Sequence, residues 1–113
     1  MTFLTTNPFK QIIDQEIPAD IVWSSDDLIA FRDISPKAKT HIIIIPKAEI
    51  ITAQEISAEN LNLFGSLFLA AKEIAEKEGL KGYKLHMNVG EEGGQVVPHV
   101  HLHLLSPDFK TNL

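Results

Sequence analysis

The 113-residue sequence contains no cysteine, which excludes two classes of structure. A disulfide framework is impossible, and so is a zinc site built on thiolates. The absence of cysteine also fits a reducing compartment. The segment from Met1 to Lys10 lacks a basic stretch followed by an apolar run, so we expect no signal peptide. The expected location is therefore the cytoplasm.

Long apolar runs and basic blocks are missing as well. The most apolar stretch, Ile42 to Ile45, is far too short to cross a bilayer, and we expect no membrane insertion. The formal charge is −5, and lysine and arginine are scattered along the chain. Such a chain is a poor ligand for nucleic acid, because that affinity depends on neutralising phosphates. A small phosphate ligand held by a few local donors remains compatible with this charge.

The composition is that of one small globular domain over residues 1–113, with a short polar tail from Ser106 to Leu113. Its hydrophobic share of 44% and charged share of 22% are ordinary for such a domain. Asn7-Pro8 predicts the start of a short helix, since Asn is a favoured N-cap and Pro fits the first turn. Apolar residues at helical spacing from Leu61 predict a long helix that Gly79 ends.

Five segments have the residue types of strands. The predicted strands are Asp20–Trp23, Leu28–Arg32, His41–Ile45, Tyr83–Val89 and Val96–Leu105. The β-branched run in the third of these indicates burial on both faces at the centre of a sheet. Together the elements predict an α+β domain: a five-stranded antiparallel sheet, one long helix before the last hairpin and a short N-terminal helix.

The strongest chemical signal is the row His99-Val100-His101-Leu102-His103. Alternate side chains of a strand share a face, so we expect three imidazoles on one face while Val100 and Leu102 face a core. Histidine titrates near neutral pH and serves as nucleophile, acid or phosphate donor. One alternative is a polar strand face that merely contains histidines. Another is a metal site, whose further ligands would come from His41, His86, Asp33 or a glutamate.

Three other segments carry groups suited to a phosphate or nucleotide. Glycines in Gly93-Gly94-Gln95 let backbone amides approach an anion, although a plain hairpin turn also needs them. Asn88 is either a phosphate-binding amide or a turn residue. Asp33 suits two ribose hydroxyls, while its pattern alone favours a turn role. The pattern alone predicts that His41 is a core residue, and it predicts no specific role for His86. Four apolar residues are candidates for the wall of a base slot, although each is more often core: Phe9, Ile12, Phe31 and Ile34.

In their order along the chain, these segments resemble the histidine-triad (HIT) superfamily, and within it the Hint branch of nucleoside phosphoramidases. The family motif, His-x-His-x-His followed by two apolar residues, matches His99–Leu105. The other matching blocks are Phe31–Pro36 with Thr40–Lys47, Ile12–Ile13 with Glu16–Pro18, and Asn88 with Gly93–Gln95. The likeness runs from about Pro8 to Leu105, nearly the whole chain.

The resemblance implies a hydrolase that cleaves purine nucleoside phosphoramidates or related AMP- and GMP-type substrates. His101 would attack the α-phosphorus, and water would then hydrolyse the nucleotidyl-histidine intermediate to a nucleoside monophosphate. His99 would orient His101 through its backbone carbonyl, and His41 would support the nucleophile. His103 would hydrogen-bond the phosphate or the leaving group. No metal and no cofactor is implied.

The resemblance also implies binding roles and an assembly. Asn88 and the amides near Gly94 and Gln95 would hold phosphate oxygens, and Asp33 would bind the ribose hydroxyls. The nucleotide would further contact four apolar residues: Ile34 and Phe31 beside the ribose and base, and Phe9 and Ile12 at the base pocket. A homodimer whose sheets join across the interface is the implied assembly.

Three departures from the Hint pattern bear on activity. Val96 stands where many relatives have a serine, so a hydroxyl donor is lost, and Pro98 replaces a common aromatic residue. The tail after Leu105 is shorter than in relatives. Val96 and this tail keep a second function open: a nucleotide-binding or interaction protein with weak catalysis. A dinucleoside-polyphosphate hydrolase on the same scaffold is a third, although the segment Asp33–Pro36 favours the Hint branch.

Overall fold

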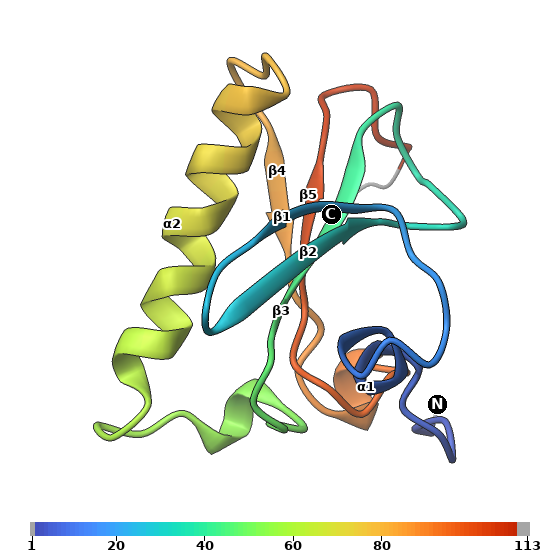
Figure 1. The fold of residues 1–113 in the computed structure, drawn as a ribbon, viewed down its shortest axis with the longest axis vertical. Helices are drawn as coiled ribbons and strands as arrows, with labels where there is room; N and C mark the ends of the chain where they lie inside the picture. Colours follow the sequence, from blue (N-terminus) through green and yellow to red (C-terminus); the bar gives the residue numbers. More distant parts are fainter. Residues whose placement is uncertain (1, 111–113) are drawn as a thin grey trace.

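The computed structural model describes residues 2–110, which form a five-stranded antiparallel sheet with helices against both of its faces (Figure 1). The strands are β1 (Ile21–Ser24), β2 (Leu28–Arg32), β3 (His41–Pro46), β4 (Lys84–His86) and β5 (Leu102–Leu105). The α-helices are α1 (Pro8–Ile13) and α2 (Leu61–Lys77), and the 3-10 helices are η1 (Ala53–Glu55) and η2 (Glu91–Gly93). The predicted α+β architecture is confirmed.

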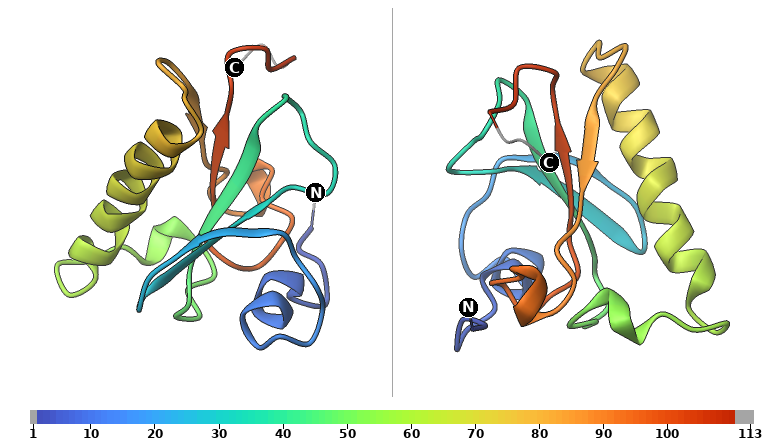
Figure 2. Two further views of the ribbon diagram at one scale, coloured as in Figure 1. Left: turned by 45° about the horizontal axis from the view of Figure 1, so that its top comes forward. Right: turned by 180° about the vertical axis from the view of Figure 1, so that it is seen from behind.

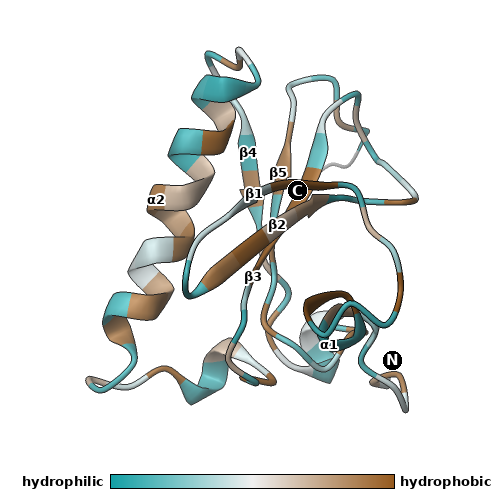
Figure 3. Ribbon diagram, viewed as in Figure 1, coloured by the Kyte–Doolittle hydropathy of each residue, from teal (hydrophilic) through white to brown (hydrophobic). Residues whose placement is uncertain are grey.

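The strands lie in the order β1-β2-β3-β5-β4, with every neighbouring pair antiparallel. All six residues of β3 are buried, as its β-branched sequence predicts for a central strand. Figure 3 shows β2 as hydrophobic along most of its length, which fits its position beside β3. The register places Ile43 of β3 opposite Phe31 on one side and His103 on the other.

The two faces of the sheet bury separate hydrophobic clusters, because successive side chains of a strand alternate between faces. Ile42 and Ile44 of β3 pack with α2, and Val100 and Leu102 lie in the same cluster, as predicted. Ile43 and Ile45 pack on the opposite face with α1. In both views of Figure 2, α2 and α1 lie on opposite sides of the sheet. The face of the sheet that packs against α1 also carries His103, since His103 pairs with Ile43.

Local signals mark the start of α1 and the end of α2. The side chain of Asn7 accepts hydrogen bonds from the backbone N–H groups of Phe9 and Lys10, and Pro8 occupies the first helical position. At the C-terminal end of α2, Gly79 adopts a φ of +75°, which other residues rarely tolerate. The helix start near Asn7 and the stop at Gly79 are therefore confirmed.

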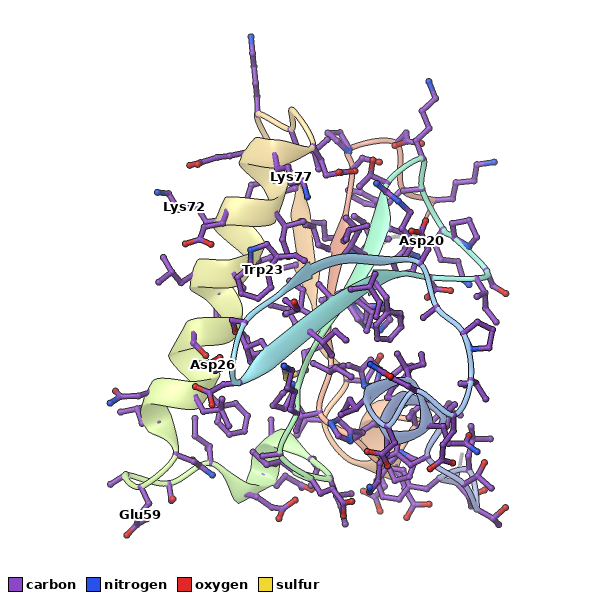
Figure 4. The ribbon with its side chains drawn as sticks, viewed as in Figure 1. Asp20, Trp23, Asp26, Glu59, Lys72 and Lys77 are labelled. Carbon is purple, nitrogen blue, oxygen red and sulfur yellow. The ribbon has the colours of Figure 1, made fainter. Side chains whose placement is uncertain are left out.

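The apolar stripe at helical spacing from Leu61 differs from the face of α2 that is buried. Leu61 and Phe68 fit that spacing but are 57% and 55% exposed, while Ala70 is buried. At 100° per residue the buried positions centre between Leu67 and Ala71, and Phe68 lies about 90° from that centre. Figure 4 shows Trp23 beside α2, where it packs against the core, and Lys77 at the end of α2. None of the helices in residues 2–110 is long and apolar enough to span a membrane.

The last two strands are shorter than the sequence predicts. The predicted strand Val96–Leu105 begins only at Leu102, and Tyr83–Val89 narrows to Lys84–His86. Pro98 has no N–H to donate, and the N–H of Val100 donates to the carbonyl of Ile50 rather than to a neighbouring strand. The segment that contains His99 and His101 is therefore held outside the sheet ladder. The turn predicted near Gly90–Gly94 forms η2, and η1 was not predicted.

Candidate active site

Four histidines meet on the α1 side of the sheet and form an imidazole cluster of His41, His86, His101 and His103. The ring of His103 lies at its centre, 5.0 Å from that of His101, 5.1 Å from that of His41 and 5.7 Å from that of His86. The sheet brings them together, since His103 pairs directly with His86 across β4 and β5. His41 lies on β3, two residues before the other partner of His103.

His101 presents a lone pair. Its Nδ1 lies 2.7 Å from the carbonyl oxygen of His99, and a carbonyl only accepts, so Nδ1 carries the proton. Burial lowers the pKa of His101, so the ring is neutral and Nε2 is unprotonated. No described side chain bonds to this Nε2, yet none of the described residues buries an unpartnered polar side-chain atom. The Nε2 atom is therefore not fully buried, although His101 as a whole is only 7% exposed.

His103 has the opposite tautomer. The backbone N–H of Lys37 donates to His41 Nδ1 at 3.0 Å, so a neutral His41 carries its proton on Nε2. That Nε2–H donates to His103 Nδ1 at 2.9 Å, which leaves the His103 proton on Nε2. Burial, and then the neighbouring His101 and His41, lower the pKa of His103 to about 3. A lone pair on His101 thus lies beside an N–H on His103.

Asp33 lies next to this relay. One carboxylate oxygen accepts from the N–H of Ser35 at 2.7 Å, which is the turn role that its pattern favours. The other oxygen is 3.4 Å from His41 Nε2. Burial lowers the pKa of His41 more than Asp33 raises it, so the ring is neutral and this contact is not an ion pair. Ligand atoms of Asp33, His41 and His103 lie within 4.8 Å of one another, but a metal there would have to replace the His41–His103 hydrogen bond.

A cavity of about 240 Å³ opens over these groups. Its lining comprises Asp33, Lys37, His41, His86, Asn88, His103 and Leu105. Asn88 accepts from His86 Nε2 at 3.1 Å and donates to the carbonyl of Gly93 at 2.8 Å, so one amide hydrogen is left for a ligand. The sequence pattern predicts no specific role for His86 and none for Lys37. The two-residue spacing of His86 and Asn88 was a signal, but only the strand register shows that it faces His103.

His99 departs from the expected row of three imidazoles. Its ring is fully buried, where Nε2–H donates to the carbonyl of Pro46 at 2.8 Å and Nδ1 accepts from Asn7 at 2.9 Å. The rings of His101 and His103 pack edge-on, whereas His99 makes no ring contact with either among the described residues. The reason is that His99 precedes β5 and follows a turn in which its N–H bonds to Val97. Its carbonyl nevertheless contacts His101, as the family resemblance implies.

Gly94 and Gln95 lie differently from their expected phosphate roles. The N–H of Gly94 donates to Glu91 O and that of Gln95 to Gly90 O, so both have partners inside the turn. The buried side chain of Gln95 accepts from Gly90 N and donates to the carbonyls of Ile51 and Val97. Gln95 is therefore a structural residue in this conformation.

Three of the four residues expected around a base lie in the core. Phe9, Ile12 and Phe31 are at most 9% exposed and belong to the cluster between α1 and the sheet. The ring of Phe9 also packs edge-on against His101, with centroids 5.0 Å apart. Ile34, in contrast, is 96% exposed after Asp33 and is available to a ligand. Ile12 and Phe31 pack in this core, and their contact with a base stays a prediction.

Known proteins are similar to this chain in sequence and in fold. The HIT domain family model matches residues 14–110. The purine nucleoside phosphoramidase of Escherichia coli (strain K12) is 50% identical over 99 residues, covering 86% of this chain and 83% of the relative. A HIT family hydrolase from Legionella pneumophila Philadelphia 1 superposes with a TM-score of 0.88 at 41% identity, covering 95% of this chain and 97% of that one.

A histidine triad protein from Clostridium difficile gives the same TM-score of 0.88 at 28% identity, and the match covers 97% of each chain. Likeness in sequence and in structure thus extends over nearly all of the described residues. The imidazole cluster lies within the matched residues 14–110. The chain belongs to the HIT domain family and is a nucleotide hydrolase of that family.

Proposed function

We propose that this hydrolase cleaves purine nucleoside phosphoramidates and releases a nucleoside monophosphate. The observation that carries the proposal is the pair of opposite tautomers, a lone pair on His101 Nε2 beside an N–H on His103 Nε2. A nucleophile next to a hydrogen-bond donor suits attack on phosphorus, where the donor stabilises charge on oxygen. The 50% identity to a protein named purine nucleoside phosphoramidase supports this choice of substrate.

The reaction divides into two displacements at phosphorus. His101 Nε2 attacks the α-phosphorus, an N–P bond to His101 forms, and the P–N bond to the leaving amine breaks. Water then attacks the same phosphorus, the bond to His101 breaks, and the nucleoside monophosphate departs. The leaving nitrogen takes up one proton as its bond to phosphorus breaks, and the attacking water gives up one proton in the second step. The net reaction therefore consumes one water and releases the amine and the nucleoside monophosphate. His103 Nε2–H would hold a phosphate oxygen or the leaving nitrogen in both steps.

The cavity suggests where the rest of a nucleotide lies. We assign the free amide hydrogen of Asn88 to a phosphate oxygen, and the Asp33 carboxylate to the ribose hydroxyls. Ile34, exposed beside Asp33, is the proposed apolar contact for the base, with Phe9 as support for the nucleophile. Contacts from the Gly94 and Gln95 amides would require the η2 turn to rearrange, because both are occupied.

The proposal is tested by trapping the intermediate. Wild-type protein mixed with adenosine 5′-phosphoramidate should release AMP, and a rapid acid quench should give a peptide containing His101 that carries one adenylyl group. Peptide mass spectrometry measures the adduct. Faster cleavage of diadenosine polyphosphate would favour the dinucleoside-polyphosphate hydrolase. Tight AMP binding without turnover of any substrate would favour the binding protein with weak catalysis.

Asp33→Asn is expected to raise KM for adenosine 5′-phosphoramidate about 10-fold, since a charge-assisted bond to the ribose is lost. Asparagine keeps the oxygen that accepts from Ser35, so the turn should survive. Steady-state kinetics measures KM. The control is the 2′,3′-dideoxy substrate, for which the variant and the wild type should agree. An unchanged KM for the ribose substrate would remove Asp33 from the ribose site.

The homodimer and the cytoplasmic location stay predictions. β4 is an edge strand of the sheet, which suits a sheet continued by a second copy. Three large apolar residues of α2, Leu61, Phe68 and Leu69, are between 55% and 60% exposed, and a partner would cover them. A solution mass of one chain by light scattering would contradict the dimer.

A further inference from the structure

The N-terminal segment, residues 3–9, runs beside the chain that leads into β5. The N–H of Phe3 donates to Glu91 Oε2 at 2.7 Å, and the N–H of Leu4 donates to the carbonyl of Val96 at 2.8 Å. Figure 2 shows this N-terminal part next to η2 in both views. Two further contacts continue the series toward the nucleophile: Asn7 with His99, and Phe9 with His101.

These contacts matter because the segment that contains His99 and His101 is not hydrogen-bonded into the sheet. Regular pairing of β5 begins at Leu102, so neither His99 nor His101 belongs to the ladder. The position of the nucleophile therefore depends on bonds made outside the sheet. Among the polar bonds from the N-terminal segment, the bond from Asn7 to His99 reaches the residue that is nearest in sequence to His101.

The orientation of the Asn7 amide is fixed by α1. Its Oδ1 accepts from the N–H groups of Phe9 and Lys10, each at 3.1 Å, so its Nδ2 faces His99. His99 Nε2 faces the carbonyl of Pro46, so its proton is there and Nδ1 bears a lone pair. Asn7 Nδ2–H therefore donates to His99 Nδ1, and the buried His99 ring has both nitrogens satisfied.

We propose that Asn7 is a positioning residue for the nucleophile, acting through His99, and this inference rests on the proposed function. Asn7 fixes the His99 ring, and the carbonyl of the same residue holds the proton on His101 Nδ1. That proton sets the tautomer and the direction of the attacking Nε2 lone pair. One side chain thus couples the capping of α1 to the geometry of the reaction.

Two capping variants separate this role from helix stability. Asn7→Ser and Asn7→Asp both keep an oxygen that caps α1, but neither keeps the amide donor. Asn7→Ser should lower kcat about 10-fold at every pH with KM within about twofold, since small misplacements of a reacting group are costly. The carboxylate introduced by Asn7→Asp can bind His99 only when Nδ1 is protonated. The kcat of Asn7→Asp should therefore approach the wild-type value near pH 6 and fall toward pH 9, with an ionisation that the wild type lacks.

The charged groups that act on His99 are known. Burial lowers the pKa of His99; of the charged side chains, Glu49 raises this pKa and Lys10 lowers it, and these two side chains also pair with each other at 3.1 Å. Both are present in the wild type and in each variant. A new ionisation in Asn7→Asp alone would thus come from the introduced carboxylate. Equal kcat values for the wild type and both variants across this pH range would overturn the proposal.

A measurement without substrate tests the role of Asn7 independently of the proposed function. Imidazole ¹⁵N NMR should show His101 protonated at Nδ1 alone in the wild type, and a mixture of tautomers in Asn7→Ser. If the wild type failed to cleave the phosphoramidate, the proposed function would fail and these spectra would still decide the role of Asn7. A His101 ring protonated only at Nδ1 in all three proteins would overturn the proposal.

Discussion

His101→Ala should lower kcat for adenosine 5′-phosphoramidate by roughly a thousandfold or more, because it removes the attacking atom. The Nε2 atom of His101 is the unprotonated nitrogen beside the His103 N–H. Alanine cannot form the nucleotidyl adduct, so the mass shift on this peptide should vanish together with turnover. Stopped assays of AMP release and quenched mass spectrometry measure the two losses in the same sample.

A matched control comes from another histidine of the imidazole cluster. His86→Gln changes a ring that contacts His103 but has no part in the proposed bond to phosphorus. We expect this variant to keep the adduct on His101, and with it most of the activity. An adduct found on His103 in the wild-type protein would contradict the assignment of His101 as nucleophile. Undiminished turnover in His101→Ala would contradict it as well.

Local signals explain which parts of the fold were predictable. The bounds of β2 match the prediction, because Leu28–Arg32 is an apolar run between turn residues. The N-cap at Asn7 and the stop at Gly79 depend on one or two residues each. Alternation along β3 separates Ile42 from Ile43, and the same periodicity places Val100 and Leu102 away from the histidines.

The parts that were not predictable depend on contacts between distant segments. The N–H of Val100 bonds to Ile50, 50 residues earlier, and this bond takes the chain out of the sheet before β5. His99 turns toward Asn7 for the same reason. His86 enters the site through the register of β4 against β5, which a single sequence does not contain. The side chain of Gln95 bonds to Gly90, Ile51 and Val97, which gives it a structural role, and its expected phosphate contact stays a prediction.

Moderate acid should destabilise this protein strongly, because three buried histidines and the half-buried His103 are held neutral. Burial is the largest cause of a lowered pKa at His41, His99, His101 and His103. In the unfolded chain these rings bind protons near pH 6.5, while the folded chain resists protonation. The unfolded state therefore binds more protons below this pH, and the free energy of unfolding falls as the pH is lowered.

The pH range in which stability is lost distinguishes the contribution of the histidines from that of the carboxylates. The stabilisation from His103 is fully present above about pH 6.5 and is lost as the pH falls toward its folded pKa of about 3. The pKa values of Glu59 and Asp108 are also lowered, by hydrogen bonds from Ser57 and Ser106. Their contribution declines only below their ordinary values of 4.5 and 3.8. Losses between about pH 6.5 and pH 5 therefore report on the histidines.

Urea unfolding at pH 7.5, 6.5 and 5.5 measures the effect. For His103 alone we expect a loss of about 1 kcal/mol per pH unit below pH 6.5, and the other three rings add to it with the same sign. His103→Gln removes one titrating ring, so its stability should fall less steeply with acid by about the same amount per pH unit. The two slopes would be equal if His103 were protonated as readily in the fold as in the unfolded chain. A free energy of unfolding that stayed constant from pH 7.5 to 5.5 would mean that the imidazole cluster is not held neutral, and the lone pair on His101 would then have to be generated by substrate binding.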